Sequence, residues 1–230
     1  MKIKILFLVS SFSDYNSMVH ARGLAKVLFP YYNVEIGTME GNIINNDDLK
    51  GYSMLYCINC VYSNDTDIPI LFSSDLISKY GNGIDLDFYY PKKGKDYNIW
   101  DRKMVVGYNG DNNNINELKL SDEYELLIFN AYKHELSKLR DMYHDIDCLI
   151  CELDDIKYME AYGCGIPVLF TDGDVSTIIS NLDFMRANYM DAVNNALECR
   201  DDFFFNNNWK VLGESYYNEF EDIIHRKQDI

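Results

Sequence analysis

The fold of this chain is decided by one stretch of its sequence, Cys151-Glu-Leu-Asp-Asp-Ile-Lys-Tyr-Met-Glu-Ala-Tyr-Gly-Cys-Gly-Ile-Pro-Val-Leu-Phe170. An apolar run that ends at Cys151 leads into it, and a second apolar run, residues 166–170, leads out of it. The residues between the two runs are enough for a loop and about two helical turns. This pattern predicts a strand, a loop, a short helix and a second strand, which together form one parallel βαβ step.

The same alternation of apolar strands and amphipathic helices extends outward in both directions. We expect strands at residues 3–9, 33–38, 53–61, 103–107 and 125–130. We expect helices at residues 17–28, with Ser17 as the N-cap, and at 133–143, 175–180 and 189–199. A last helix opens near residue 206 and carries an apolar stripe of Trp209, Leu212, Tyr216, Phe220 and Ile223. The pattern predicts an α/β protein.

Two glutamates within residues 151–170 suggest a binding site. Glu152 falls at the end of the first predicted strand, and Glu160 follows on the helix with seven residues between them. In open α/β sheets, ligands bind at the carboxyl ends of the strands. Carboxylates placed there could accept hydrogen bonds from the hydroxyl groups of a sugar or a ribose.

Three segments, in this order, resemble the retaining glycosyltransferases of the family-4 type, which have the two-domain GT-B fold. The first is Asn82-Gly-Ile-Asp-Leu-Asp-Phe-Tyr-Tyr-Pro91, which is similar to the interdomain segment of that family. The second is Val105-Val-Gly-Tyr-Asn-Gly110, which is similar to the first strand and glycine loop of its nucleotide-binding domain. The third is Glu160-Ala-Tyr-Gly-Cys-Gly-Ile-Pro-Val168, which is similar to the second half of its donor-binding signature.

The resemblance implies two doubly wound, Rossmann-like domains. Residues 1–81 would form a reduced acceptor-side domain, and residues 82–230 would form the domain that binds the nucleotide-sugar, with a closing C-terminal helix. The implied reaction is transfer of a sugar, with retention, from a nucleotide-diphosphate sugar to an unidentified acceptor, without a metal or another cofactor. Glu152 would be the catalytic-site residue that contacts the transferred sugar. The implied donor-binding residues are Glu160, at the ribose, and Gly107, Asn109, Gly110, Asp155, Ile156 and Lys157.

The sequence also departs from the family pattern near the donor phosphates. Leu153, Asp154 and Asp155 stand where the family has a Gly-aromatic-Gly loop, and an Asp here is better explained as a helix N-cap. No arginine follows the glycine loop, and Lys119, Lys133 and Lys157 are alternative sources of the missing charge. These departures favour an alternative: a degenerate, non-catalytic module that binds a nucleotide or a protein partner. A plain α/β scaffold is a third interpretation.

Composition limits the classes of partner. The chain has 230 residues and a formal net charge of −16. That charge repels nucleic acid and anionic lipid, so we expect no general binding to either. No apolar stretch reaches the roughly 18 residues that a membrane-spanning helix needs, and residues 1–10 predict a buried strand rather than a signal peptide. We therefore expect a cytoplasmic protein, and a homodimer if the reduced domain leaves an apolar surface exposed.

The cysteine, aspartate and histidine patterns do not favour a metal or redox site. Two Cys-x-x-Cys pairs, Cys57/Cys60 and Cys148/Cys151, lie in runs that predict strands. Residues three apart in a strand point to opposite faces, so we expect free buried thiols rather than a metal clamp. An Asp-x-Asp pattern ending at Asp147 is common by chance in so acidic a chain. The histidines show no metal-ligand spacing, and for His20 we expect an exposed or core position.

Overall fold

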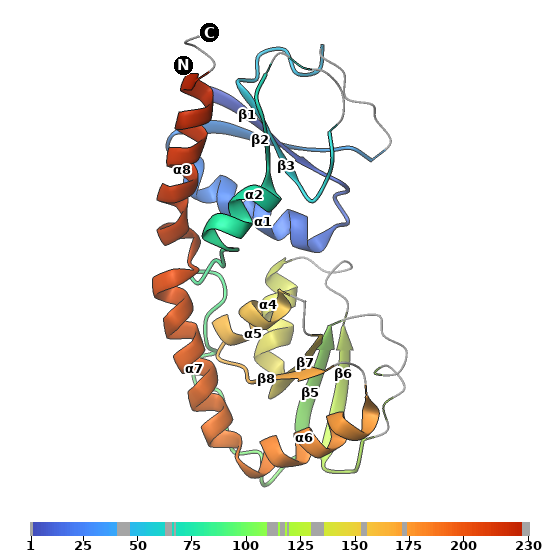
Figure 1. Ribbon diagram of the computed structural model, residues 1–230. Coiled ribbons are helices and arrows are strands. Elements are labelled where there is room, and N and C mark those ends of the chain that lie inside the picture. The colour runs from blue at the N-terminus through green and yellow to red at the C-terminus, as the bar shows by residue number, and fades with distance from the viewer. Residues whose placement is uncertain are drawn as a thin grey trace. The chain divides into compact units, whose positions relative to one another are not determined.

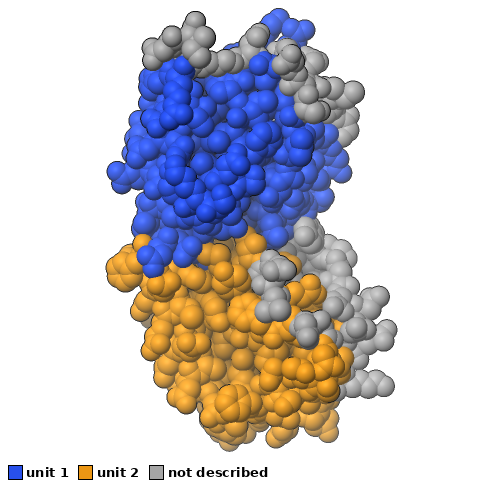
Figure 2. Space-filling view, in the orientation of Figure 1, with its two compact units in different colours: residues 1–85, 206–230 blue, residues 86–205 orange. Residues whose placement is uncertain are grey.

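The chain forms two compact units (Figure 2). The computed structural model describes residues 2–40, 47–62, 66, 68–109, 115, 118, 120–129, 136–152, 156–171 and 174–226. The first unit consists of residues 1–85 and 206–230, and the second of residues 86–205. The sequence predicts two consecutive domains, residues 1–81 and 82–230. The first compact unit instead combines an N-terminal segment with the C-terminal segment that begins at residue 206.

The first unit is built on a four-stranded sheet in which every strand runs parallel to its neighbours (Figure 1). The order across the sheet is β2-β1-β3-β4. The strands are β1 (Ile3–Val9), β2 (Tyr32–Thr38), β3 (Met54–Ile58) and β4 (Ile70–Phe72). The helices of this unit are α1 (Tyr15–Leu28), α2 (Ser73–Tyr80) and α8 (Trp209–Arg226).

The two faces of this sheet are covered differently. On one face, alternate residues of the central strands, such as Phe7 and Tyr56, pack against all three helices in the main core. On the other face, Leu8 and Cys57 pack against residues from connecting segments, such as Leu49 and Tyr62. The alternation of side chains along β1 and β3 therefore supplies two separate apolar layers.

The second unit repeats the same strand order. Its parallel sheet has the order β6-β5-β7-β8. The strands are β5 (Met104–Asn109), β6 (Tyr124–Phe129), β7 (Cys148–Glu152) and β8 (Val168–Thr171). The helices are α4 (Leu136–Asp145), α5 (Lys157–Gly163), α6 (Val175–Ala187) and α7 (Tyr189–Asn206). No helix in the described ranges has both the length and the apolar character needed to cross a membrane.

The predicted fold class is confirmed at the level of an α/β protein with two all-parallel sheets flanked by helices. The structure also corrects two local predictions and adds two elements. The N-cap of α1 is Asp14 rather than Ser17, because the Asp14 carboxylate accepts the Ser17 backbone N–H. Strand β3 ends at Ile58 instead of continuing to residue 61. Strand β4 and helix α2 were not predicted at all.

The side chain of Trp209 joins α8 to the rest of the first unit. It is 2% exposed and belongs to the main core. A Cβ atom added at either Gly23 or Gly83 would lie closer than 3.0 Å to the indole ring. The ring therefore occupies the space that a side chain at these two positions would need, so both positions require glycine.

The backbone next to Trp209 is fixed as well. Ile84 and Asn208 form an isolated parallel bridge, in which Ile84 N–H donates to Asn207 O at 2.8 Å and Trp209 N–H donates to Ile84 O at 3.1 Å. The chain leaves the first unit after Asp85 and re-enters it at Asn206. The outgoing and returning segments are thus hydrogen-bonded to each other at this point.

His20 is a core residue, one of the two alternatives that the sequence left open. Its ring is 3% exposed and meets the Trp209 ring edge-on. Nδ1 lies 3.0 Å from Asn82 Oδ1, and Nε2 lies 3.0 Å from the Tyr56 hydroxyl. Because the amide oxygen only accepts, Nδ1 carries the proton and Nε2 accepts from Tyr56. Burial lowers the pKa of His20 from 6.5 to about 4, so the ring is neutral.

We expect Gly83→Ala to lower the free energy of unfolding by about 1–3 kcal/mol, because the new methyl group overlaps the Trp209 ring. Urea denaturation measures this change. The control is Gly37→Ala, where the added Cβ would meet the Leu6 side chain at 3.3 Å, a contact that a small shift relieves. Equal destabilisation by the two variants would contradict the packing role of Gly83.

The neutral His20 predicts a loss of stability in acid. Between pH 6.5 and about 4 the unfolded chain binds a proton at this residue and the folded chain does not, so stability falls as the pH falls. The expected contribution over this window is about 3 kcal/mol. Denaturation as a function of pH should give a shallower slope for His20→Asn than for wild type. A slope that His20→Asn leaves unchanged would contradict the burial of a neutral imidazole.

Candidate functional site

The sheet of the second unit has a topological switch point between β5 and β7. From β5 the chain passes to β6 on one side and then to β7 on the other side of β5. At such a point, the connections on the two sides diverge and leave room for a ligand at the carboxyl ends of the strands. Asn109 is the last residue of β5 and Glu152 is the last residue of β7. The switch point is therefore bordered by one of the two predicted glutamates.

Glu152 is exposed and is held by a buried tyrosine. The Tyr108 hydroxyl donates to Glu152 Oε1 at 3.2 Å. Tyr108 lies on β5 within the core that faces α6 and α7. Because the tyrosine ring is fixed by packing, its hydroxyl restricts where the Glu152 carboxylate can lie. The result is an oriented carboxylate at the carboxyl edge of the sheet.

Glu160 is in a different environment. Its side chain is 2% exposed on α5. Tyr89 donates to Oε1 at 2.7 Å, and Tyr143 donates to Oε2 at 2.8 Å. A buried carboxylate requires such donors, because desolvation without them costs several kcal/mol. These bonds connect α5 to α4 and to the segment before β5, so Glu160 has a clear structural role.

The two glutamates therefore have separate surroundings. Glu152 accepts a hydrogen bond from β5, whereas Glu160 accepts hydrogen bonds from α4 and from residue 89. Helix α5 has only seven residues. The donor-binding role that the resemblance implied for Ile156 and Lys157, at the start of this helix, stays a prediction.

The structure places the other predicted donor residues as follows. Gly107 lies inside β5, where an added Cβ would be 2.5 Å from Ile146 Cδ1 and 3.2 Å from Phe129 Cε1. Packing alone thus explains this glycine. Asn109 ends β5, Ile156 directly precedes α5, and Lys157 is the buried first residue of α5. Gly110 and Asp155 lie outside the described residues.

Sequence reasoning missed an ion-pair cluster at the opposite, amino end of β7. Asp147 is 1% exposed and accepts two hydrogen bonds from the Arg102 guanidinium, at 2.5 and 2.8 Å. It also accepts the Val105 backbone N–H at 2.8 Å. This set of partners gives Asp147 a structural explanation. Across the described ranges, no group of three or more His, Cys, Asp or Glu side chains is arranged to hold a metal ion.

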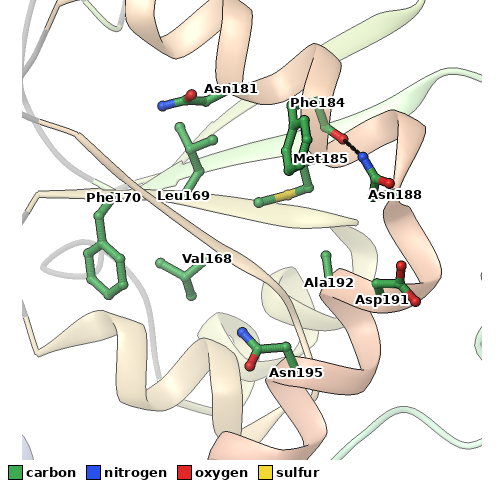
Figure 3. Close-up of a pocket in the computed structure, with 10 residues that line it drawn as sticks. All are labelled: Val168, Leu169, Phe170, Asn181, Phe184, Met185, Asn188, Asp191, Ala192 and Asn195. Atoms are coloured by element: carbon green, nitrogen blue, oxygen red, sulfur yellow. Dashed lines mark hydrogen bonds between the residues drawn. The ribbon is translucent and has the colours of Figure 1, made fainter.

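A pocket of about 490 Å³ lies elsewhere in the second unit, beside the edge strand β8 (Figure 3). Side chains of β8, α6 and α7 border it, among them Val168, Phe170 and Met185. The Asn188 amide at its rim donates to Phe184 O at 2.9 Å. Neither predicted glutamate lines this pocket. It is therefore separate from the site at the switch point.

Comparison with known proteins adds no family to this description. No family model matches the chain, and no curated protein gives a significant match.

We expect Glu160→Gln to lower the free energy of unfolding by about 1–3 kcal/mol, because one tyrosine hydroxyl would then face an amide NH₂ in place of an acceptor. Tyr143→Phe should cost a similar amount, and the double variant should cost less than the sum. Glu198→Gln, an exposed position on α7, is the control. Additive effects measured in urea would argue against a coupled Glu160–Tyr143 pair.

Proposed function

We propose that this protein is a retaining glycosyltransferase of the GT-B type, which uses a nucleotide-diphosphate sugar and places the donor at the switch point of the second unit. The observation that carries the proposal is the exposed Glu152 carboxylate at the carboxyl end of β7, oriented by the Tyr108 hydroxyl. The order of the three segments that resemble the family supports it from the sequence side.

In the proposed reaction, the bond between the anomeric carbon and the donor phosphate oxygen breaks, and a bond to an acceptor hydroxyl forms on the same face. The nucleoside diphosphate leaves, and the acceptor proton passes to a phosphate oxygen. Glu152 accepts hydrogen bonds from hydroxyl groups of the transferred sugar. An oriented carboxylate contributes most if these bonds strengthen as the anomeric carbon becomes positively charged.

Glu160 supports the site from within the fold in this proposal. Its bonds to Tyr89 and Tyr143 hold α5 in place, and α5 begins at Lys157, five residues after Glu152. The role at the ribose that the resemblance implied for Glu160 stays a prediction. So does the identity of the cation that would face the donor phosphates.

A second candidate is a non-catalytic module that binds a nucleotide or a protein partner. The buried state of Glu160 favours the form that binds a protein partner, because both carboxylate oxygens already accept hydrogen bonds from tyrosines. A ribose would have to share these oxygens with, or displace, donors that are well packed.

Calorimetric titration with UDP, GDP and ADP and with their common sugar conjugates tests the proposal, together with an assay of donor hydrolysis. We expect one nucleotide to bind selectively and its sugar conjugate to be hydrolysed slowly. Glu152→Gln keeps the oxygen that accepts from Tyr108 and removes the charge. It should lower kcat about tenfold or more with little change in KM.

Glu125→Gln is the matched control, because Glu125 is an exposed glutamate on β6, which β5 separates from β7, and its replacement should not change donor binding or hydrolysis. Selective nucleotide binding without turnover would favour the non-catalytic module. A folded sample that binds no nucleotide would overturn the donor site itself.

A further inference from the structure

The chain contains the Cys-x-x-Cys spacing twice, and the two pairs differ in backbone conformation. Cys148 and Cys151 both lie within β7, so they point to opposite faces of the sheet. Cys148 belongs to the core that faces α6 and α7. Cys151 interacts instead with Tyr158 and Tyr162 of α5. This pair behaves as the strand alternation predicts.

Cys57 and Cys60 do not follow that alternation, which corrects our sequence-based expectation. Strand β3 ends at Ile58, and Asn59 has a φ of +50°, in the left-handed region. The chain therefore turns before Cys60. Cys60 packs on the same apolar layer as Cys57, although an extended strand would have put it on the layer of Tyr56 and Ile58.

The turn places both cysteines of this pair in one apolar layer, where each shifts the pKa of the other. The Cys60 thiol donates to Leu8 O on the neighbouring strand β1 at 3.2 Å. Cys57 is buried, whereas Cys60 is partly exposed. An external reagent can therefore reach Cys60 more readily than Cys57.

The greater exposure of Cys60 and the directions of the two pKa shifts favour attack by Cys60. Donation from the Cys57 thiol and from the Ile58 backbone N–H lowers the pKa of Cys60. The same pairing, together with burial, raises the pKa of Cys57. The thiolate is the nucleophile in thiol–disulfide exchange, so Cys60 is the thiol that reacts first.

We propose that Cys57 and Cys60 form a dithiol–disulfide couple that exchanges with low-molecular-weight disulfides. The Cys60 thiolate attacks one sulfur of the external disulfide, forms a mixed disulfide and releases one thiolate. Cys57 then gives up its proton and attacks the Cys60 sulfur, which closes the intrachain disulfide and releases the second thiol. The two cysteines lose two electrons and two protons, and the external disulfide is reduced to two thiols.

The couple is placed where it can affect the carboxyl edge of the first sheet. Asn59, between the two cysteines, donates from Nδ2 to Ser17 Oγ at 3.0 Å and from its backbone N–H to Ser73 Oγ at 3.2 Å. It follows β3, which together with β1 borders the switch point of this sheet. Closing the disulfide fixes the turn that carries these hydrogen bonds. The proposal involves only the first unit and does not depend on the proposed donor site.

The test incubates the folded, reduced protein with glutathione disulfide, blocks the remaining thiols with an alkylating reagent and maps the peptides without reduction. We expect a Cys57–Cys60 disulfide, together with Cys148 and Cys151 recovered as alkylated thiols. The second pair has the same spacing in the same molecule, so it is an internal control. Recovery of Cys57 and Cys60 as free thiols, or disulfide formation to the same extent in both pairs, would overturn the proposal.

Two variants separate the roles of the cysteines. Cys57→Ala removes the resolving thiol, so a stable glutathione adduct should accumulate on Cys60. Cys60→Ala should leave Cys57 unmodified, because Cys57 is buried. Circular dichroism confirms that each variant is folded. An adduct on Cys57 in the folded Cys60→Ala protein, or none on Cys60 in the folded Cys57→Ala protein, would contradict the order of attack.

Discussion

The first unit depends on one packing interaction, the insertion of the Trp209 indole between Gly23 and Gly83. The ring fills the space that a side chain at either glycine would need. Trp209 is also the first residue of α8. Because α8 then contributes Leu212, Tyr216, Phe220 and Ile224 to the main core, the sheet of this unit is covered by residues from both ends of the chain. The bridge between Ile84 and Asn208 fixes the backbone at the same place. The core of the first unit therefore cannot be completed until α8 has been synthesised.

The packing around Trp209 also weakens the resemblance to the glycosyltransferases as evidence for function. The segment that opens with Asn82 is one of the three family-like landmarks, yet each of its first residues has a local task in the first unit. Asn82 accepts from His20, Gly83 makes room for Trp209, and Ile84 forms the bridge. Gly107 in the second landmark is likewise explained by packing against Ile146 and Phe129. The functional argument therefore depends chiefly on the third segment and on Glu152.

Much of the fold could be predicted because its strongest signals are local. Continuous apolar runs mark buried parallel strands, and β1 spans the residues expected from its run. The β7–α5–β8 step follows from the same reasoning. Strand β4 has only three residues, too few for a periodic signal, so it and α2 were missed. The side of the sheet on which Cys60 packs depends on the left-handed Asn59, and the Arg102–Asp147 pair depends on contacts distant in sequence. Neither can be derived from spacing alone.

The two glutamates show why a sequence pattern does not determine function. The spacing predicts two carboxylates near one sheet edge, but it does not distinguish an exposed carboxylate from a buried one. Glu160 has already lost its hydration and gained two tyrosine donors, so a ligand there must compete with bonds whose loss leaves buried groups unsatisfied. Glu152 is exposed, so a sugar hydroxyl can reach the carboxylate that Tyr108 orients. Exposure, more than position in a motif, makes Glu152 the better candidate for contact with substrate.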